Sequence, residues 1–410
     1  MYYTEAEAVE FLNDHDVTFI RLEFCDPYGT MKNVSIMSAD LNRAFTAGIS
    51  IDASAIQGFA TVDESDLFLR PVPSTLTLLP WRPAQGRTAS FYCEITYPDG
   101  RPFEMDSRRI LQKAVDHAEM MGIRCSFGAE CEFYLFQRDE EGRPTLIPSD
   151  DATYMDVAPL DKGESVRREI CLALQQMDFT PEASRHEVGP GQNEIDFRYS
   201  DAMTSADNVQ TFKSVVETVA AANGLHANFR PKPLADQAGN GFHVNMSPRR
   251  LGSTDPDPEL KRHFMAGILA RVREITAFLN PTEESYQRLG SFKAPRYVSW
   301  SPLNRSQLIR IPAGTGEYDR IELRSADCMT NPYLAYALLL EAGLEGIAGE
   351  WEPPEPVNRN LYEAPKNELQ EIPQLPSTYH EAIRLAEESQ LVRRVLPEGT
   401  LTAYRSQARE

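Results

Sequence analysis

The stretch FGAECEFYLF, residues 127–136, alternates in the way that is typical of a β-strand with one buried face. Successive side chains of a strand point to opposite faces, so Glu130 and Glu132 would lie side by side on the same face. The simplest interpretation is a solvent-facing strand with ordinary charged positions. The alternative is a strand whose neighbouring carboxylates bind a cation, because close carboxylates otherwise repel each other.

Three further stretches repeat this alternation, namely RHEVGPGQNEIDFRYSD (185–201), GNGFHVNMS (239–247) and DRIELRSAD (319–327). Each alone could be an ordinary sheet with a wet side. Together they place carboxylates, one imidazole and several guanidinium groups on the polar faces of one predicted sheet. The polar positions are Glu187, Glu194 and Asp196; His243, Asn245 and Ser247; and Arg320, Glu322 and Arg324.

Oxygen ligands with a single imidazole favour hard divalent ions such as Mg²⁺ or Mn²⁺. Arginines beside such a cluster suit phosphate and carboxylate oxygens, which they bind as bidentate forks. Metal and arginine together indicate phosphoryl transfer. The chain has no G-x-x-x-x-G-K-[ST] and no complete G-x-G-x-x-G motif. A nucleotide would therefore be held by a site on the sheet rather than by a phosphate-binding loop.

Composition limits the classes of protein that fit. The chain has 410 residues, of which 41% are hydrophobic and 25% charged, as expected for a folded protein of two or three domains. Its formal net charge of -20 argues against a nucleic-acid or anionic-membrane partner. The segment MYYTEAEAVEFL has acidic residues where a signal peptide needs basic ones, and no apolar run is long enough to span a membrane, so we expect a cytoplasmic protein.

The six cysteines show neither C-x-x-C nor paired zinc spacing, so we expect reduced thiols without disulfides or structural zinc.

Residues 5–13 look helical, and two strands should flank a turn at residues 26–29. A helix capped by Asp106 or Ser107 follows the strand SFYCEITY, which places a domain boundary near residues 100–106. The remainder predicts an α+β domain, with a mainly antiparallel sheet, helices on one side and a last helix over residues 377–396.

Several long motifs in order resemble the glutamine synthetase family of the bacterial type. They include FCDPYGTMKNVSI, DASAIQGF, FGAECEF, HEVGPGQNEIDF, PKPLADQAGNGFHVNMS, NPTEESYQRL, NRSQLIRIP, RIELRSADCMTNPYLAYA and NLYEAP. The resemblance implies a β-grasp domain over residues 1–103 and a catalytic domain over residues 104–410, whose curved antiparallel sheet forms a funnel. It also implies a homo-oligomer, a dodecamer of two hexameric rings with active sites between subunits. The implied reaction ligates ammonia to L-glutamate with ATP and Mg²⁺ or Mn²⁺, two or more ions per site.

The resemblance also assigns roles to positions of this sequence. One metal falls on Glu132, Glu187 and Glu194, and a second on Glu130, His243 and Glu322. The glutamate site falls on Gly239, Arg288 and Arg324. The nucleotide falls on Glu182, Asn245, Ser247, Arg305, Arg310 and Arg320. The catalytic set is Asp52, Arg305 and Arg324. Asp52 would bind ammonium in the active site of an adjacent subunit, and the two arginines would take up transition-state charge.

Departures from the family pattern lie on the acceptor side. Lys293 in GSFKAP stands where a flap glutamate is usual, Ala238 replaces an asparagine, and DASAI replaces D-G-S-S-I. Lys293 either faces the acceptor, which it would disfavour if cationic, or points to solvent. Two alternatives to an ammonia ligase therefore stay open, a γ-glutamyl ligase using another amine and a non-catalytic ring that binds nucleotide or glutamate. Tyr362 in NLYEAP aligns with a tyrosine that some members adenylylate.

Overall fold

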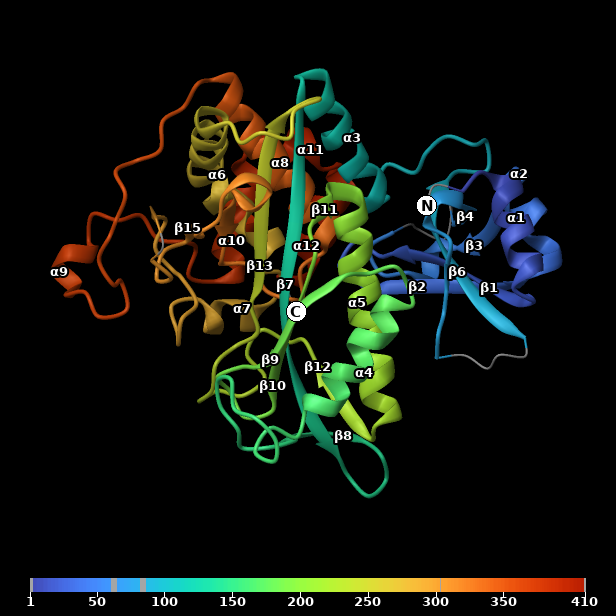
Figure 1. Ribbon diagram of the computed structural model, residues 1–410. Coiled ribbons are helices and arrows are strands. Elements are labelled where there is room, and N and C mark those ends of the chain that lie inside the picture. Colours follow the sequence, from blue (N-terminus) through green and yellow to red (C-terminus); the bar gives the residue numbers. More distant parts are fainter. Residues whose placement is uncertain (1–2, 60–64, 82–85, 303, 409–410) are drawn as a thin grey trace.

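The computed structural model describes residues 3–59, 65–81, 86–302 and 304–408. Among these residues the strands form two sheets, and the smaller sheet lies beside the larger domain (Figure 1). The smaller sheet has the order β2-β1-β6-β4-β3, with β5 beside β6 and only β1 and β6 parallel in the described part. Its elements are α1 (Glu5–Asp14), β1 (Val17–Cys25), β2 (Met31–Met37), α2 (Leu41–Thr46), β3 (Ile49–Asp52), β4 (Asp66–Pro71), β5 (Thr77–Leu78) and β6 (Arg87–Thr96).

The predicted turn between β1 and β2 is present. Asp26 accepts hydrogen bonds from the backbone of Tyr28 at 3.0 Å and of Thr30 at 2.9 Å. Gly29 has a φ of +81°, and a Cβ there would lie 2.8 Å from the Asn331 Cα. Both the backbone conformation and the close approach to the larger domain require glycine at this position.

The larger sheet follows the path β14-β15-β16-β13-β7-β10-β9, and β8, β11 and β12 also pair with β7. All of its described pairs are antiparallel except β14 with β15, as the sequence predicted for a mainly antiparallel sheet. The strands are β7 (Ile123–Arg138), β8 (Pro144–Pro148), β9 (Pro181–His186), β10 (Gln192–Phe197), β11 (Ser200–Asp201), β12 (Leu225–Asn228), β13 (Phe242–Arg250), β14 (Trp300–Pro302), β15 (Ile309–Ile311) and β16 (Ile321–Leu323).

Helices flank this sheet, and Figure 1 shows α5 running beside the long strand β7. The odd-numbered residues of β7 face helices: Phe127 stacks on Tyr336 of α8 with ring centroids 4.4 Å apart, and Phe133 meets Phe212 of α5 edge-on. The even-numbered face, which carries Glu130, is therefore left for the site. The helices are α3 (Ser107–Met120), α4 (Glu164–Gln175), α5 (Ala202–Ala222), α6 (Pro258–Leu279), α7 (Glu283–Arg288), α8 (Pro332–Ala348), α9 (Lys366–Leu369), α10 (Tyr379–Glu388), α11 (Gln390–Val395) and α12 (Glu398–Gln407).

The prediction of one last helix over residues 377–396 is wrong. The helix breaks at Ser389, whose hydroxyl accepts a hydrogen bond from the Val392 amide at 3.2 Å and so begins α11. Pro397 then precedes a further helix, α12. No helix among the described residues is both long and apolar enough to cross a membrane.

Asp207 on α5 joins the smaller sheet to the helices of the larger domain. Its carboxylate accepts hydrogen bonds from Arg108 at 2.9 and 2.7 Å and from the Tyr333 hydroxyl at 2.7 Å. Its backbone carbonyl accepts one from the Tyr92 hydroxyl of β6 at 2.9 Å. Asp207 and the Arg108 side chain are both largely buried.

We expect Asp207→Ala to lower the free energy of unfolding by about 3–5 kcal/mol, because Arg108 would stay buried without its counter-charge. Urea denaturation followed by circular dichroism measures this change. The matched control is Asp99→Ala, which removes an exposed ion pair with Arg101 and should leave the denaturation curve nearly unchanged. Equal shifts in the two variants would contradict the role given to Asp207.

Candidate active site on the large sheet

Strand register brings the acidic residues together. In the antiparallel pair of β7 and β10, Glu132 lies opposite Glu194, and in the pair of β7 and β13, Glu130 lies opposite His243. Cross-strand neighbours on one face have their Cβ atoms about 5 Å apart. The two glutamates of FGAECEFYLF therefore meet polar partners from different neighbouring strands, and Cys131 between them is fully buried on the opposite face.

One acidic group consists of Glu132, Glu187 and Glu194, whose nearest ligand atoms all lie within 4.8 Å of one another. Burial, with the charge of Glu187, raises the pKa of Glu132; burial, with Asp196 and Glu132, raises the pKa of Glu194. A divalent cation between these groups would relieve both effects. The oxygen donors and their spacing fit Mg²⁺ or Mn²⁺.

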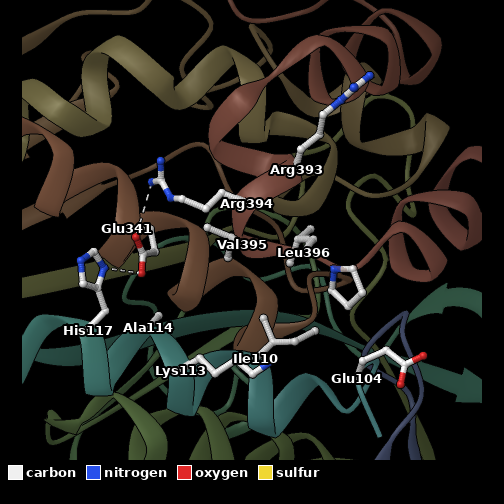
Figure 2. Close-up of a pocket in the computed structure, with 11 residues that line it drawn as sticks. Glu104, Ile110, Lys113, Ala114, His117, Glu341, Arg393, Arg394, Val395 and Leu396 are labelled. Atoms are coloured by element: carbon white, nitrogen blue, oxygen red, sulfur yellow. Dashed lines mark hydrogen bonds and ion pairs between the residues drawn. The ribbon is translucent and has the colours of Figure 1, made fainter.

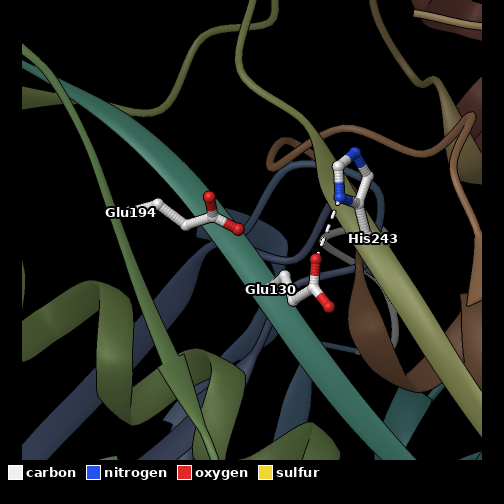
Figure 3. Close-up of side chains that lie close together, drawn as sticks. All are labelled: Glu130, Glu194 and His243. Atoms are coloured by element: carbon white, nitrogen blue, oxygen red, sulfur yellow. Dashed lines mark hydrogen bonds and ion pairs between the residues drawn. The ribbon is translucent and has the colours of Figure 1, made fainter. Parts of the chain in front are cut away.

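A second group consists of Glu130, Glu194 and His243, again within 4.8 Å, so that Glu194 belongs to both groups (Figure 3). The His243 Nδ1 lies 3.1 Å from Glu130, and Asn245 donates a hydrogen bond to the same carboxylate at 2.9 Å. Burial opposes ionisation of Glu130, but these contacts outweigh it and lower its pKa to about 2. Glu130 is thus held as a carboxylate, which is the form that binds metal.

Glu322 lies next to the second group but makes different contacts. Its side chain is fully buried; one oxygen lies 2.5 Å from Arg324 and the other 2.5 Å from Arg310. The His243 Nδ1 is 4.0 Å from the same carboxylate. The structure therefore brings Glu130, His243 and Glu322 close together, as the predicted metal site requires. The group whose ligand atoms lie within 4.8 Å of one another contains Glu194 instead of Glu322.

Asn245 links the acidic groups to the predicted nucleotide residues. Its Oδ1 accepts a hydrogen bond from Arg320 at 2.9 Å, while its amide donates to Glu130. The β16 strand covers only Ile321–Leu323, so Arg320 and Arg324 flank the strand rather than lie within it as predicted. Ser247, further along β13, donates to the backbone carbonyl of Asp319 at 3.1 Å.

The predicted glutamate residues meet beside Glu132. Arg288 is buried and donates to the backbone carbonyl of Ser325 at 2.7 Å and of Arg324 at 3.4 Å. A Cβ on Gly239 would lie 2.2 Å from the Pro231 carbonyl oxygen and 2.9 Å from Arg288, so only glycine fits. Residues 238–241 can therefore pass close to the arginine, and the Gly239 carbonyl accepts a hydrogen bond from Gln192 at 3.2 Å.

The chain does not bring every predicted residue to this cluster. Asp52 ends β3 in the smaller sheet, where its carboxylate is exposed and accepts hydrogen bonds from Ser54 at 2.6 and 3.0 Å. Glu182 and Arg305 are also exposed, Glu182 on β9 and Arg305 in the loop before β15. The roles of these three residues stay predictions.

The departures from the family pattern have definite surroundings. Lys293 is exposed, and its Nζ lies 5.8 Å from the centroid of the Tyr154 ring. Its backbone carbonyl accepts a hydrogen bond from the Tyr362 hydroxyl at 2.5 Å. Ala238 offers only its carbonyl, which accepts a hydrogen bond from Tyr134 at 2.6 Å. Tyr362, which aligns with a tyrosine that some family members adenylylate, therefore contacts the loop that carries Lys293.

Arg185, a charged residue of the site, has no role among the residues predicted from the sequence. Arg185 on β9 lies opposite Glu194 and forms ion pairs with Glu187, Glu194 and Asp196. The sequence held a signal for this residue. Arg185 and Glu187 are two residues apart and so would lie on the same face of a strand, and the Gly-Pro-Gly turn brings the next strand back antiparallel beside it. The register that places Arg185 on Glu194 could not be read without the turn geometry.

A cavity of about 420 Å³ lies elsewhere, between α3, α8 and α11 (Figure 2). Its wall includes Ile110 and Leu396. His117 lies within hydrogen-bond distance of Glu341, which forms an ion pair with Arg394. None of the predicted site residues lines it. The candidate active site is the polar face of the large sheet.

Comparisons with known proteins agree with this architecture. The family model "Glutamine synthetase, beta-Grasp domain" matches residues 16–98, and "Glutamine synthetase, catalytic domain" matches residues 104–410. A glutamine synthetase from Clostridium saccharobutylicum is 43% identical, with 98% of this chain and 93% of the relative covered. One from Methanosarcina mazei is 44% identical, with 98% and 92% covered.

Solved structures give the same result. A GmaS complex with ADP has a TM-score of 0.90 at 27% identity, with 100% of this chain and 96% of that chain covered. A glutamine synthetase of Plasmodium falciparum has a TM-score of 0.87 at 23% identity, covers 100% and 95%, and supports the fold alone.

The fold and the site define an enzyme class in which a β-grasp domain precedes an antiparallel sheet lined with carboxylates and arginines. The chain belongs to the glutamine synthetase family. The predictions of this family, of the α+β fold and of an ATP-dependent glutamine-forming enzyme are confirmed. The readings as a ligase for another amine or as a non-catalytic ring are not favoured, because the match to curated glutamine synthetases runs over nearly the whole chain.

Proposed function

We propose that this enzyme joins ammonia to the γ-carboxylate of L-glutamate through a γ-glutamyl phosphate, and that two divalent ions, Mg²⁺ or Mn²⁺, bind on the polar face of β7. The observation that carries the proposal is the pair of acidic groups that share Glu194. Two such groups side by side would provide ligands for two divalent ions. When bound, these ions would neutralise the phosphates of ATP and the charge that develops in transfer.

The residues of the chain have separable tasks. Glu132, Glu187 and Glu194 would hold one ion, and Glu130 and His243, with Glu322 or Glu194, the other. Arg310, Arg320, Asn245 and Ser247 lie along β13, β15 and β16 where a nucleotide would run, with Arg305 and Glu182 completing its contacts. The structural neighbour GmaS, solved as a complex with ADP, supports a nucleotide as a ligand of this fold.

In the proposed first step, a γ-carboxylate oxygen of glutamate attacks the terminal phosphorus of ATP and ADP leaves. Arg288 and the Gly239 backbone hold the glutamate, and Arg324 and Arg305 face the charge that spreads over the phosphoryl oxygens. In the second step, ammonia attacks the acyl carbon, the carbon–oxygen bond to phosphate breaks and phosphate leaves. Asp52 of a neighbouring subunit would take the proton released from ammonium.

We infer a homo-oligomer because the family resemblance places Asp52, which ends β3 in the smaller sheet, in the active site of an adjacent subunit. We propose the dodecamer of two hexameric rings that the family resemblance implies, in the cytoplasm. Exposed large apolar side chains between residues 154 and 160 suit contact with another subunit. They are Tyr154, Met155, Val157 and Leu160.

Purified protein with ATP, glutamate and Mg²⁺ or Mn²⁺ tests the proposal when phosphate release is measured with ammonium and then with a panel of small amines. We expect turnover that requires glutamate, metal and ammonium together. Turnover with another amine but not with ammonium would overturn the choice of acceptor. Phosphate release without any amine would indicate hydrolysis of the intermediate by water.

The flap position gives a specific prediction. Lys293→Glu places a carboxylate where it can attract ammonium, so the KM for ammonium should fall by about tenfold, the effect of about 1.4 kcal/mol. Lys293→Gln, which removes the charge without adding one, is the control and should give a smaller decrease. An unchanged KM in both variants would show that the exposed Lys293 points away from the acceptor.

A further inference from the structure

Arg185 is a cation placed among the carboxylates of the first acidic group. Its Nη2 lies 2.8 Å from Glu194, its Nη1 lies 2.8 Å from Asp196, and its Nε lies 3.3 Å from Glu187. The side chain is 22% exposed, so the charge is largely removed from water. Two of its three partners belong to the group of Glu132, Glu187 and Glu194, and neither sequence motif nor family resemblance gave Arg185 a role.

We propose that Arg185 is a resident counter-charge that sets the affinity of this carboxylate group for a divalent cation. The inference rests on the proposed metal assignment, and it concerns how tightly the ion is held rather than which residues hold it. A guanidinium cannot lose its proton at physiological pH, so its charge opposes metal binding under all working conditions.

The geometry shows how both cations can share the group. A guanidinium presents donors along three edges, and Arg185 uses a different nitrogen for each carboxylate. Its closest contacts are with Oε1 of Glu187 and Oε2 of Glu194. A carboxylate has two oxygens with about four lone-pair sites, so each can contact Arg185 and bind an ion at the same time. Arg185 thus reduces the negative charge at the group without filling its ligand positions.

Asp196 keeps Arg185 in place. It follows Glu194 by two residues on β10, so both side chains lie on the same face, and it lies in neither compact acidic group. Its ion pair with Arg185 would persist if Glu187 and Glu194 turned toward a metal. Removal of Arg185 should therefore strengthen metal binding, whereas removal of the Asp196 charge should weaken it, because Arg185 would then pair more fully with the two ligands.

The experiment measures Mn²⁺ binding to full-length, metal-stripped protein by calorimetry, together with thermal unfolding across a Mn²⁺ titration. We expect Arg185→Gln to lower the dissociation constant of the tightest Mn²⁺ site by about tenfold or more. Without metal, the Arg185→Gln variant should melt at a lower temperature than the unaltered chain, because its carboxylates have lost their counter-charge. The rise in its melting temperature on addition of Mn²⁺ should therefore be larger. Arg185→Lys, which keeps the charge, should stay within about threefold of the unaltered chain.

Arg271→Gln is the matched control. Arg271 pairs with Glu274 and Glu345 on helices and has a similar exposure of 28%, so its removal changes the net charge equally at a distance from the site. We expect its Mn²⁺ affinity to be unchanged. An unchanged or weaker affinity in a folded Arg185→Gln variant would overturn the inference.

A second variant keeps the test decisive if Arg185→Gln fails to fold. Asp196→Asn should weaken Mn²⁺ binding several-fold, and an unchanged or tighter affinity would then overturn the inference. Glu132→Gln separates the two proposals. If the unaltered chain binds no Mn²⁺, or if Glu132→Gln leaves Mn²⁺ binding intact, the metal assignment itself fails. If Glu132→Gln loses Mn²⁺ binding but the Arg185 and Asp196 variants bind Mn²⁺ as tightly as the unaltered chain, only the role of Arg185 fails.

Discussion

Glu132→Gln is expected to reduce turnover by about 10³-fold while the protein stays folded. The carboxylate belongs to the first acidic group, and loss of its charge removes part of the neutralisation that a bound ion and the phosphoryl group require, worth several kcal/mol in the transition state. The amide keeps an oxygen that can accept the hydrogen bond donated by the Gly241 backbone at 2.6 Å, so the strand pairing should survive.

Steady-state kinetics at several Mn²⁺ concentrations measures this effect. Glu345→Gln is the control, because Glu345 is also a partly buried, ion-paired glutamate but lies on α8 with Arg271 and Arg394. It should leave turnover and metal dependence unchanged. Near-normal activity of Glu132→Gln at saturating Mn²⁺ would show that the ion is held elsewhere.

Arg324→Ala is expected to lower kcat/KM for glutamate by about 10³-fold, with a much smaller change in the KM for ATP. The Arg324 side chain is 6% exposed and donates to Glu322, while the Arg324 backbone carbonyl accepts a hydrogen bond from Arg288, so this residue joins the metal groups to the glutamate residues. Removal of a buried charge-assisted contact made to the transferring group costs about 3–4 kcal/mol. Arg310 still neutralises Glu322, so the variant should fold.

Initial-rate kinetics with each substrate varied in turn separates the two effects. Arg320→Ala is the comparison, since Arg320 contacts Asn245 on the proposed nucleotide side and should raise the KM for ATP more than that for glutamate. A rise in the KM for ATP as large as the rise in the KM for glutamate in the Arg324 variant would contradict its place on the glutamate side.

Much of the fold and the acidic site was predictable from local pattern. The alternation around Cys131 places Glu130 and Glu132 on one face, and that face is polar in the structure because the odd-numbered residues pack on helices. The two-residue period also places His243 and Asn245 together on β13. Periodicity therefore identified the residues, although only the family resemblance assigned them to particular metals.

Contacts that depend on register between distant strands were not predictable. The pairing of Arg185 with Glu194 depends on the Gly-Pro-Gly turn, and the pairing of Arg310 with Glu322 depends on β15 lying beside β16. A one-residue change in either register would move the arginine to the other face. The helix break at Ser389 had a local signal, because serine is a favoured N-cap residue and Leu391 and Val392 follow it closely. The helical periodicity on both sides obscured this signal.

In the proposed reaction, glutamate is activated by phosphorylation before the amine attacks. This order of steps can be tested with glutamate labelled by the heavy oxygen isotope in both γ-carboxylate oxygens, incubated with the enzyme, ATP, Mg²⁺ and ammonium, with mass spectrometry of the products. We expect one labelled oxygen in each phosphate released and one in each glutamine formed. Unlabelled phosphate released alongside glutamine would contradict this order of steps.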